Sequence, residues 1–100
     1  MKQLTETHIK GQIRDFLAAM QIFSYPIMQG LGCYPGLPDR VIHFNGRVIY
    51  LEVKTTKGKL SDHQIAFQEQ CEQDGIKYRV IRDLEGLQEV LNETYSDKTH

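Results

Sequence analysis

The chain has 100 residues, of which 40% are hydrophobic and 25% charged, so it has the composition of a globular protein and the length of one domain. The formal net charge of −1 excludes binding to nucleic acid through an overall basic charge, and any basic surface must be local, as in the acid-free segment from Lys54 to Lys59. The two cysteines, Cys33 and Cys71, match no zinc-binding spacing and are too few for a disulfide framework.

The first third of the chain predicts a helix, a strand and a loop. Residues 5–20 carry apolar side chains at helical spacing, and Thr5 can cap the helix. Residues 22–28 predict a strand, which Pro26 places at the edge of a sheet because proline lacks a backbone donor. Residues 29–38 hold three glycines and two prolines and therefore predict a loop.

A β-hairpin is predicted next. Residues 39–44 alternate as a strand, and residues 47–54 are rich in β-branched and aromatic side chains. Asn45-Gly46 between them is the strongest short signal for a two-residue turn.

A second helix follows the hairpin. Ser61 and Gln64 have the spacing of a capping box, and Gly75 supplies a helix stop just after Asp74. Residues 77–82 then predict a short strand.

The chain ends in an amphipathic helix and a polar tail that we expect to be loose over residues 93–100. The stripe of this last helix serves either the core or a dimer interface; it consists of Leu84, Leu87, Val90 and Leu91. The element order α-β-β-β-α-β-α predicts a single α/β domain over residues 1–100. Its central mixed sheet is flanked by helices, and the fourth strand runs parallel to the third.

The hairpin register predicts that Asp39 faces Glu52. A two-residue turn makes the numbers of facing residues add up to 91, and directly opposed Cβ atoms lie roughly 4.5–5.5 Å apart. Lys54 shares the face of Glu52 because side chains alternate along a strand. Two opposed carboxylates repel, and a divalent cation would compensate. The alternative is a hairpin end with ordinary surface charges, and a β-bulge would change the register.

Two polar residues fall among apolar positions of their helices. Gln64 either closes the capping box onto Ser61 or points at the carboxylates, where it could position a water or a phosphate. Glu6 either reaches the same site or is an acid favoured by the helix dipole. Of the four histidines, only His43 shares the face of Asp39.

Three segments resemble the VRR-NUC branch of the PD-(D/E)XK nucleases: Gly36-Leu37-Pro38-Asp39, Tyr50-Leu51-Glu52-Val53-Lys54 and Ser61-Asp62-His63-Gln64. The resemblance runs from Glu6 to about Ile81 and implies a restriction-endonuclease-like core. It also implies that Asp39, Glu52 and the backbone carbonyl of Val53 bind Mg²⁺ or Mn²⁺. Lys54 would assist the attacking water, and Glu6 and Gln64 would complete the catalytic set.

The resemblance implies hydrolysis of DNA phosphodiester bonds by a homodimer acting on branched DNA such as a Holliday junction. It also indicates a phage or prophage protein, and the lack of a signal segment or apolar span predicts a cytoplasmic one without membrane association. We expect Lys57, Lys59 and Arg40 to contact the DNA backbone. The alternatives are a nicking or flap nuclease with broader substrates and a catalytically silent DNA-binding module of the same fold.

Overall fold

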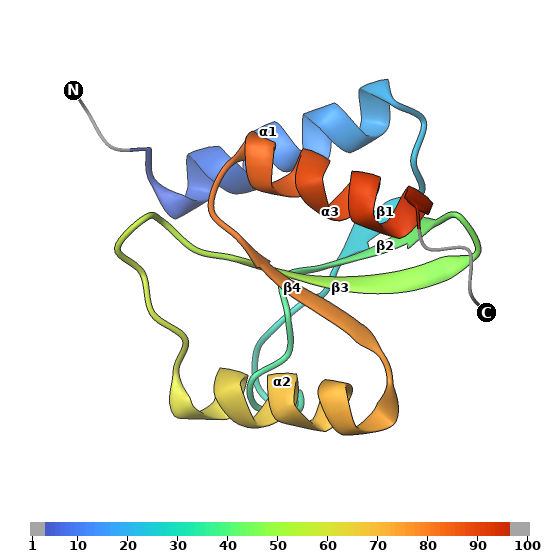
Figure 1. The fold of residues 1–100 in the computed structure, drawn as a ribbon. Coiled ribbons are helices and arrows are strands. Elements are labelled where there is room, and N and C mark those ends of the chain that lie inside the picture. The colour runs from blue at the N-terminus through green and yellow to red at the C-terminus, as the bar shows by residue number, and fades with distance from the viewer. Residues whose placement is uncertain (1–3, 97–100) are drawn as a thin grey trace.

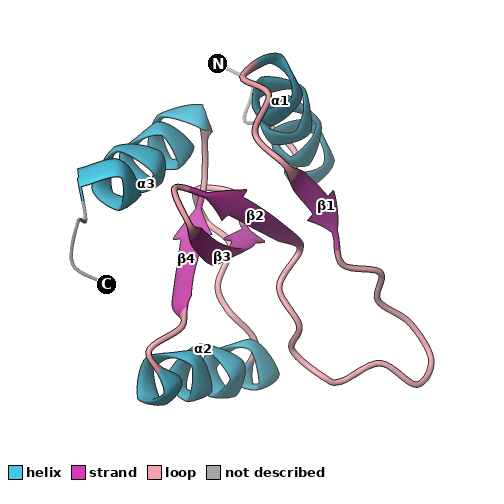
Figure 2. Cartoon of the chain, turned by 90° about the vertical axis from the view of Figure 1, so that its right-hand side faces the viewer, coloured by secondary structure: helices cyan, strands magenta, loops and turns pink. Residues whose placement is uncertain are grey.

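One mixed sheet organises the protein, whose computed structural model describes residues 4–96. The strand order is β1-β2-β3-β4, with β1–β2 and β2–β3 antiparallel and β3–β4 parallel, as predicted. Helices α1 and α3 cover one face of the sheet, and α2 covers the other (Figures 1 and 2). The elements are α1 (Glu6–Ala19), β1 (Ser24–Pro26), β2 (Arg40–Phe44), β3 (Arg47–Val53), α2 (Asp62–Asp74), β4 (Lys77–Ile81) and α3 (Leu84–Ser96).

The main core lies between the sheet and the helix pair α1 and α3. Burying each large aliphatic side chain there contributes roughly 1.5–3 kcal/mol. The stripe of α3 belongs to this core, which resolves the choice between core and interface for Leu87, Val90 and Leu91. None of the helices within residues 4–96 is both long enough and apolar enough to cross a bilayer. The other core members include Ile9, Ile13, Leu17, Ile42, Ile49, Leu51, Val53 and Ile81.

Two boundaries differ from the sequence prediction. Strand β1 is shorter than the expected 22–28, although single bonds beyond its ends continue the pairing, with Ile27 N donating to Asp39 O at 3.0 Å. The expected loose tail is wrong for residues 93–96, which are helical. Thr94 is buried there, and its hydroxyl donates to Val90 O at 2.8 Å. Residues 97–100 lie outside the described part of the chain.

The loop from 29 to 38 is held against the start of α2. The Gln29 amide donates to the carbonyl of Leu37 at 2.9 Å, which fixes the segment leading into β2. Gly36 has φ +86°, and a Cβ at this position would collide with the backbone of His63 in the first turn of α2. A glycine is therefore required there, and the close approach brings the segment before β2 next to the N-terminus of α2.

Replacing Gly36 by alanine should destabilise the fold more than replacing Gly32. Both glycines have positive φ, so each alanine costs about 1–2 kcal/mol of backbone strain. Only Gly36 has no space for a Cβ, and overpacking adds roughly 1–3 kcal/mol. Urea unfolding of Gly36→Ala and Gly32→Ala measures the difference. Equal destabilisation would contradict the close packing of loop and helix.

Candidate active site

The hairpin has the register that the sequence predicts. Phe44 pairs with Arg47 and Arg40 with Leu51 across an Asn45-Gly46 turn whose two residues have positive φ. The five pairs follow without a bulge. Asp39 comes one residue before β2, and its backbone N donates to Leu51 O at 2.9 Å, which places Asp39 beside the end of β3.

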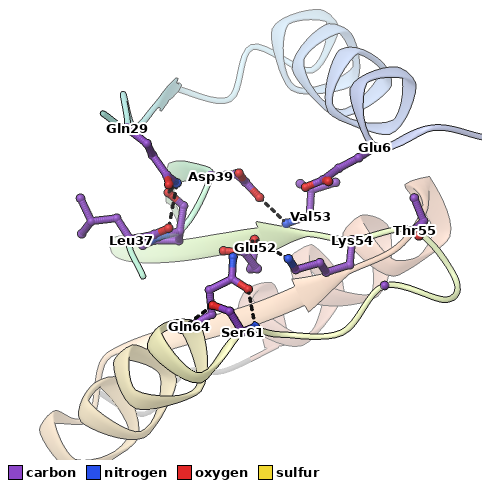
Figure 3. Close-up of polar contacts among 12 residues, drawn as sticks. Glu6, Gln29, Leu37, Asp39, Glu52, Val53, Lys54, Thr55, Ser61 and Gln64 are labelled. Carbon is purple, nitrogen blue, oxygen red and sulfur yellow. Dashed lines mark hydrogen bonds and ion pairs between the residues drawn. The ribbon is translucent and has the colours of Figure 1, made fainter. Parts of the chain in front are cut away.

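The Asp39 carboxylate is fixed by the backbone of β3. Its Oδ2 accepts a hydrogen bond of 2.7 Å from Val53 N (Figure 3). This bond occupies one oxygen and leaves Oδ1 directed elsewhere in the site. Proline at position 38 and the anchored loop before it set the direction from which Asp39 enters.

Glu52 is a buried carboxylate, with only 1% of its side chain exposed. Its Oε2 accepts from the Gln64 amide at 3.1 Å and lies 3.8 Å from the Lys54 ammonium, whereas its Oε1 is buried with no hydrogen-bond partner. Burial and the neighbouring Asp39 carboxylate raise the pKa of Glu52 to about 8, and Lys54 opposes this only in part. The charged form of Glu52 therefore lacks compensation from the protein alone.

Gln64 closes the capping box and also points at the carboxylates, so the two alternatives from the sequence do not exclude each other. Its Oε1 accepts from Ser61 N at 2.9 Å while Ser61 Oγ accepts from Gln64 N at 3.2 Å, which closes the capping box. Its Nε2 still donates to Glu52 (Figure 3). The cap thus holds the amide in place for its bond to the buried carboxylate.

Glu6 completes a cluster of three carboxylates. It points from the first turn of α1 toward the ends of β2 and β3 (Figure 3). One oxygen each from Glu6, Asp39 and Glu52 lies within 4.8 Å of the other two. Of the two alternatives for Glu6, the structure thus places its carboxylate beside Asp39 and Glu52, although Glu6 is also an acid in the first turn of α1.

Lys10 is a site residue that the sequence prediction missed. Its ammonium lies 3.0 Å from Asp39 Oδ1 and 3.7 Å from Glu6 Oε1. Burial lowers the pKa of Lys10, but the hydrogen bond to Asp39 and the charges of Asp39 and Glu6 outweigh it, and the net shift is upward. The signal was the spacing of four residues from Glu6, which places both side chains on one face of α1.

A cleft of about 660 Å³ opens onto the three carboxylates, and basic side chains also line it. Arg40 is anchored there by a 2.9 Å bond from its Nε to Ser24 Oγ. Burial and the nearby Arg14 lower the pKa of Arg40. Two guanidinium groups thus lie close together beside the acidic cluster, although the sequence prediction named only one of them.

Three other residues considered from the sequence lie, like Lys54, outside the cleft lining. Lys57 and Lys59 are exposed on the loop after β3. The ring of His43 packs edge-on against Phe23, with centroids 4.9 Å apart, and against Tyr25 at 5.8 Å. His43 therefore belongs to an aromatic surface cluster and not to the carboxylate cluster.

The acidic cluster fits a hard divalent cation. Magnesium and manganese prefer oxygen ligands, and Mg²⁺ commonly uses one or two carboxylates together with water. The buried and unpaired Oε1 of Glu52 is the observation that supports this fit, because an orphaned carboxylate oxygen is costly without a partner. One oxygen each of Asp39 and Glu6 is close enough to share the same ion.

This order of elements, with Asp39 and Glu52 at adjoining strand ends and Lys54 two residues after the glutamate, is that of the PD-(D/E)XK nuclease core. The chain belongs to the VRR-NUC domain family, whose family model matches residues 4–83. No curated protein matches the chain. The family and the acidic cluster together define a nuclease domain with a site suited to a metal ion.

The raised pKa of Glu52 predicts how stability depends on pH without metal. The folded protein keeps a proton on Glu52 up to about pH 8, whereas the unfolded chain releases it near 4.5. This contribution to stability is fully present below about 4.5 and is lost as the pH rises through about 8. The free energy of unfolding in EDTA should therefore fall by up to about 1.4 kcal/mol per pH unit in that window.

Urea unfolding of the wild type and of Glu52→Gln between about pH 5 and 8 measures this effect. The glutamine variant cannot titrate at this position, so its stability should change less with pH. The same slope in both proteins would assign the pH dependence to other groups.

Proposed function

We propose that this protein is an endodeoxyribonuclease that hydrolyses DNA phosphodiester bonds with Mg²⁺ or Mn²⁺. The observation that carries the proposal is the buried Glu52 carboxylate, whose Oε1 has no partner and which adjoins Asp39 and Glu6. A buried charge of this kind is destabilising unless it is paired. A cation held by these carboxylates would neutralise the cluster.

Asp39, Glu52 and the backbone carbonyl of Val53 are the proposed metal ligands. When bound, the cation polarises the scissile phosphate and lowers the pKa of a coordinated water. In the hydrolysis the water oxygen would bond to phosphorus as the bond to the leaving oxygen breaks, and the proton given up by the water would balance the proton taken up by the leaving oxygen. The protein's part is to hold these ligands in place, with Oδ2 of Asp39 bonded to Val53 N and Oε2 of Glu52 bonded to Gln64.

Lys54 is proposed to orient the attacking water and to stabilise the negative charge that develops on the phosphate. Its side chain is 15% exposed and its ammonium lies 3.8 Å from Glu52, so it is held beside the carboxylate cluster. Gln64 acts through Glu52, which it positions. Glu6, at 42% exposure, is suited to hold a water of the metal's outer shell.

The cleft is proposed to bind the DNA backbone. Arg40 and Arg14 line it beside the acidic cluster, and Arg40 has no carboxylate partner among the described residues. Lys57 and Lys59 on the neighbouring loop extend the basic surface. These contacts go to phosphates and carry no direct sequence information.

Branched DNA and a homodimer are the proposed substrate class and assembly. A two-fold dimer suits paired cuts across a four-way junction, because the junction has the same symmetry. The stripe of α3 is used in the core, but Phe23, Tyr25 and Val48 remain exposed. The register places Tyr25 and Val48 on the same side of the sheet as α2. This apolar surface is where a second copy would bury area.

Two alternatives remain beside the junction nuclease. A nicking or flap nuclease would use the same site on a broader set of substrates. A catalytically silent DNA-binding module would not require Lys54, yet Lys54 is held next to Glu52. The formal charge of −1 also provides little general affinity for DNA.

Removing the unpaired carboxylate should abolish cleavage. Glu52→Gln is expected to lower the rate of metal-dependent DNA hydrolysis by at least about 100-fold, the scale for losing one group that stabilises a transition state. Lys54→Ala should lose cleavage while DNA still shifts on a native gel. Glu89→Gln, on the exposed face of α3, is the matched control and should keep full activity. Retained cleavage in Glu52→Gln would refute the assigned site.

The substrate class can be tested with labelled four-way junction, flap, linear duplex and single-stranded DNA in Mg²⁺, Mn²⁺ or EDTA. We expect paired, metal-dependent cuts in the junction, because a symmetric dimer presents two sites to it. Sedimentation of the wild type and of Phe23→Ser tests the dimer. Cuts confined to flaps or spread over duplex, or a monomeric wild type, would contradict the junction-specific dimer but not the nuclease.

A further inference from the structure

Lys10 bonds the one Asp39 oxygen that the backbone does not use. Asp39 Oδ2 is held by Val53 N at 2.7 Å, while Oδ1 lies 3.0 Å from the Lys10 ammonium. The same ammonium is 3.7 Å from Glu6. It is the cation nearest to Asp39 among the described ion pairs, and it lies inside the cluster of carboxylates.

A metal ion on Asp39 Oδ1 and this ammonium would share one carboxylate oxygen. A Mg²⁺ ion binds a carboxylate oxygen at about 2.0–2.1 Å. With the ammonium 3.0 Å from the same Oδ1, the two cations would lie at most about 5 Å apart and would repel each other. A bound metal would therefore weaken the ion pair between Lys10 and Asp39 and favour its release.

The displaced side chain has an open route into the cleft. Lys10 is 46% exposed, and its stem has four flexible carbons, so the ammonium can swing without moving α1. Lys10 lines the same cleft as Arg14 and Arg40, which form its basic side. Moving from Asp39 toward these residues would place the ammonium where the DNA phosphates are proposed to lie.

We propose that Lys10 competes with the divalent cation for Asp39 and that the bound cation releases Lys10 to contact a DNA phosphate. The inference rests on the proposed nuclease function. Lys10 thereby couples the binding of the metal to the binding of DNA. Metal binding frees the Lys10 ammonium from Asp39 and Glu6, and the free ammonium can then contact a phosphate. It also lowers the intrinsic affinity of the metal site in the absence of DNA.

The first test measures Mn²⁺ binding alone, by titration calorimetry without DNA. Lys10→Met keeps the length of the stem and removes the charge, so we expect Mn²⁺ to bind about tenfold tighter or more. Arg79→Met is the matched control because Arg79 is a partly exposed cation that pairs with Glu93 at 2.6 Å and lies outside the cleft lining, and its Mn²⁺ affinity should equal that of the wild type. Equal or weaker Mn²⁺ binding by Lys10→Met would overturn the competition.

The second test measures DNA binding in Ca²⁺, with a denaturing gel to verify that the DNA stays uncut. Loss of one phosphate contact should reduce the slope of log affinity against log salt by about 0.9 in Lys10→Met. Lys10→Arg keeps the charge and should retain the slope of the wild type. An unchanged slope in Lys10→Met would overturn the transfer of Lys10 to a phosphate.

Measurements on the wild type distinguish a failure of the proposed nuclease function from a failure of the role of Lys10. If it binds no Mn²⁺ and cuts no DNA, the proposed function fails and this inference fails with it. If it binds Mn²⁺ and cuts DNA but Lys10→Met matches it in both tests, only the role of Lys10 is wrong.

Discussion

The Glu52 carboxylate is almost fully buried at the end of β3, where the cleft opens onto it. Burying an unpaired charge costs several kcal/mol, so the fold either keeps Glu52 protonated or provides a cation. The protein compensates in part, with one amide from Gln64 and an ammonium from Lys54 at 3.8 Å. The uncompensated Oε1 is what makes the site suited to a cation.

Several segments that are far apart in the sequence meet around the Glu52 carboxylate to form the acidic cluster. The tight turn at Asn45-Gly46 sets the register that brings Asp39 beside Glu52. The capping box at the start of α2 fixes the amide that reaches Glu52, and the anchored loop before β2 packs on that same first turn. Glu6 arrives from α1 on the other side of the sheet. A two-residue turn and a helix cap thus help to bring three carboxylates together in one site.

The sequence predicts the parts of this arrangement that depend on periodicity and on turn chemistry. Alternation along two strands and a two-residue turn suffice to place Asp39 near Glu52, and a capping box suffices to begin α2 at the correct residue. The sequence could not decide between the two contacts of Gln64, with Ser61 or with the carboxylates, because both predict the same pattern, a polar residue among apolar positions. In the structure one amide side chain makes both contacts, with Ser61 and with Glu52.

Contacts between distant segments could not be predicted in the same way. The close approach of Gly36 to α2 depends on how a loop folds back, which neither propensity nor spacing encodes. The bond between Lys10 and Asp39 joins a helix to a strand end, so helical spacing places Lys10 beside Glu6 but does not show that it reaches Asp39. The sequence placed the end of α3 too early because Thr94 is polar. In the structure the Thr94 hydroxyl donates to Val90 O within the helix, and this hydrogen bond allows Thr94 to be buried.

The most direct test of the central claim is a crystal structure of the protein soaked in Mn²⁺, with anomalous scattering used to locate the ion. The account predicts one anomalous peak among Glu6, Asp39 and Glu52, bonded to Asp39 Oδ1 and to the now occupied Oε1 of Glu52, with the Lys10 ammonium turned into the cleft. An empty cluster at a saturating concentration of Mn²⁺, or an ion bound only elsewhere on the surface, would contradict it.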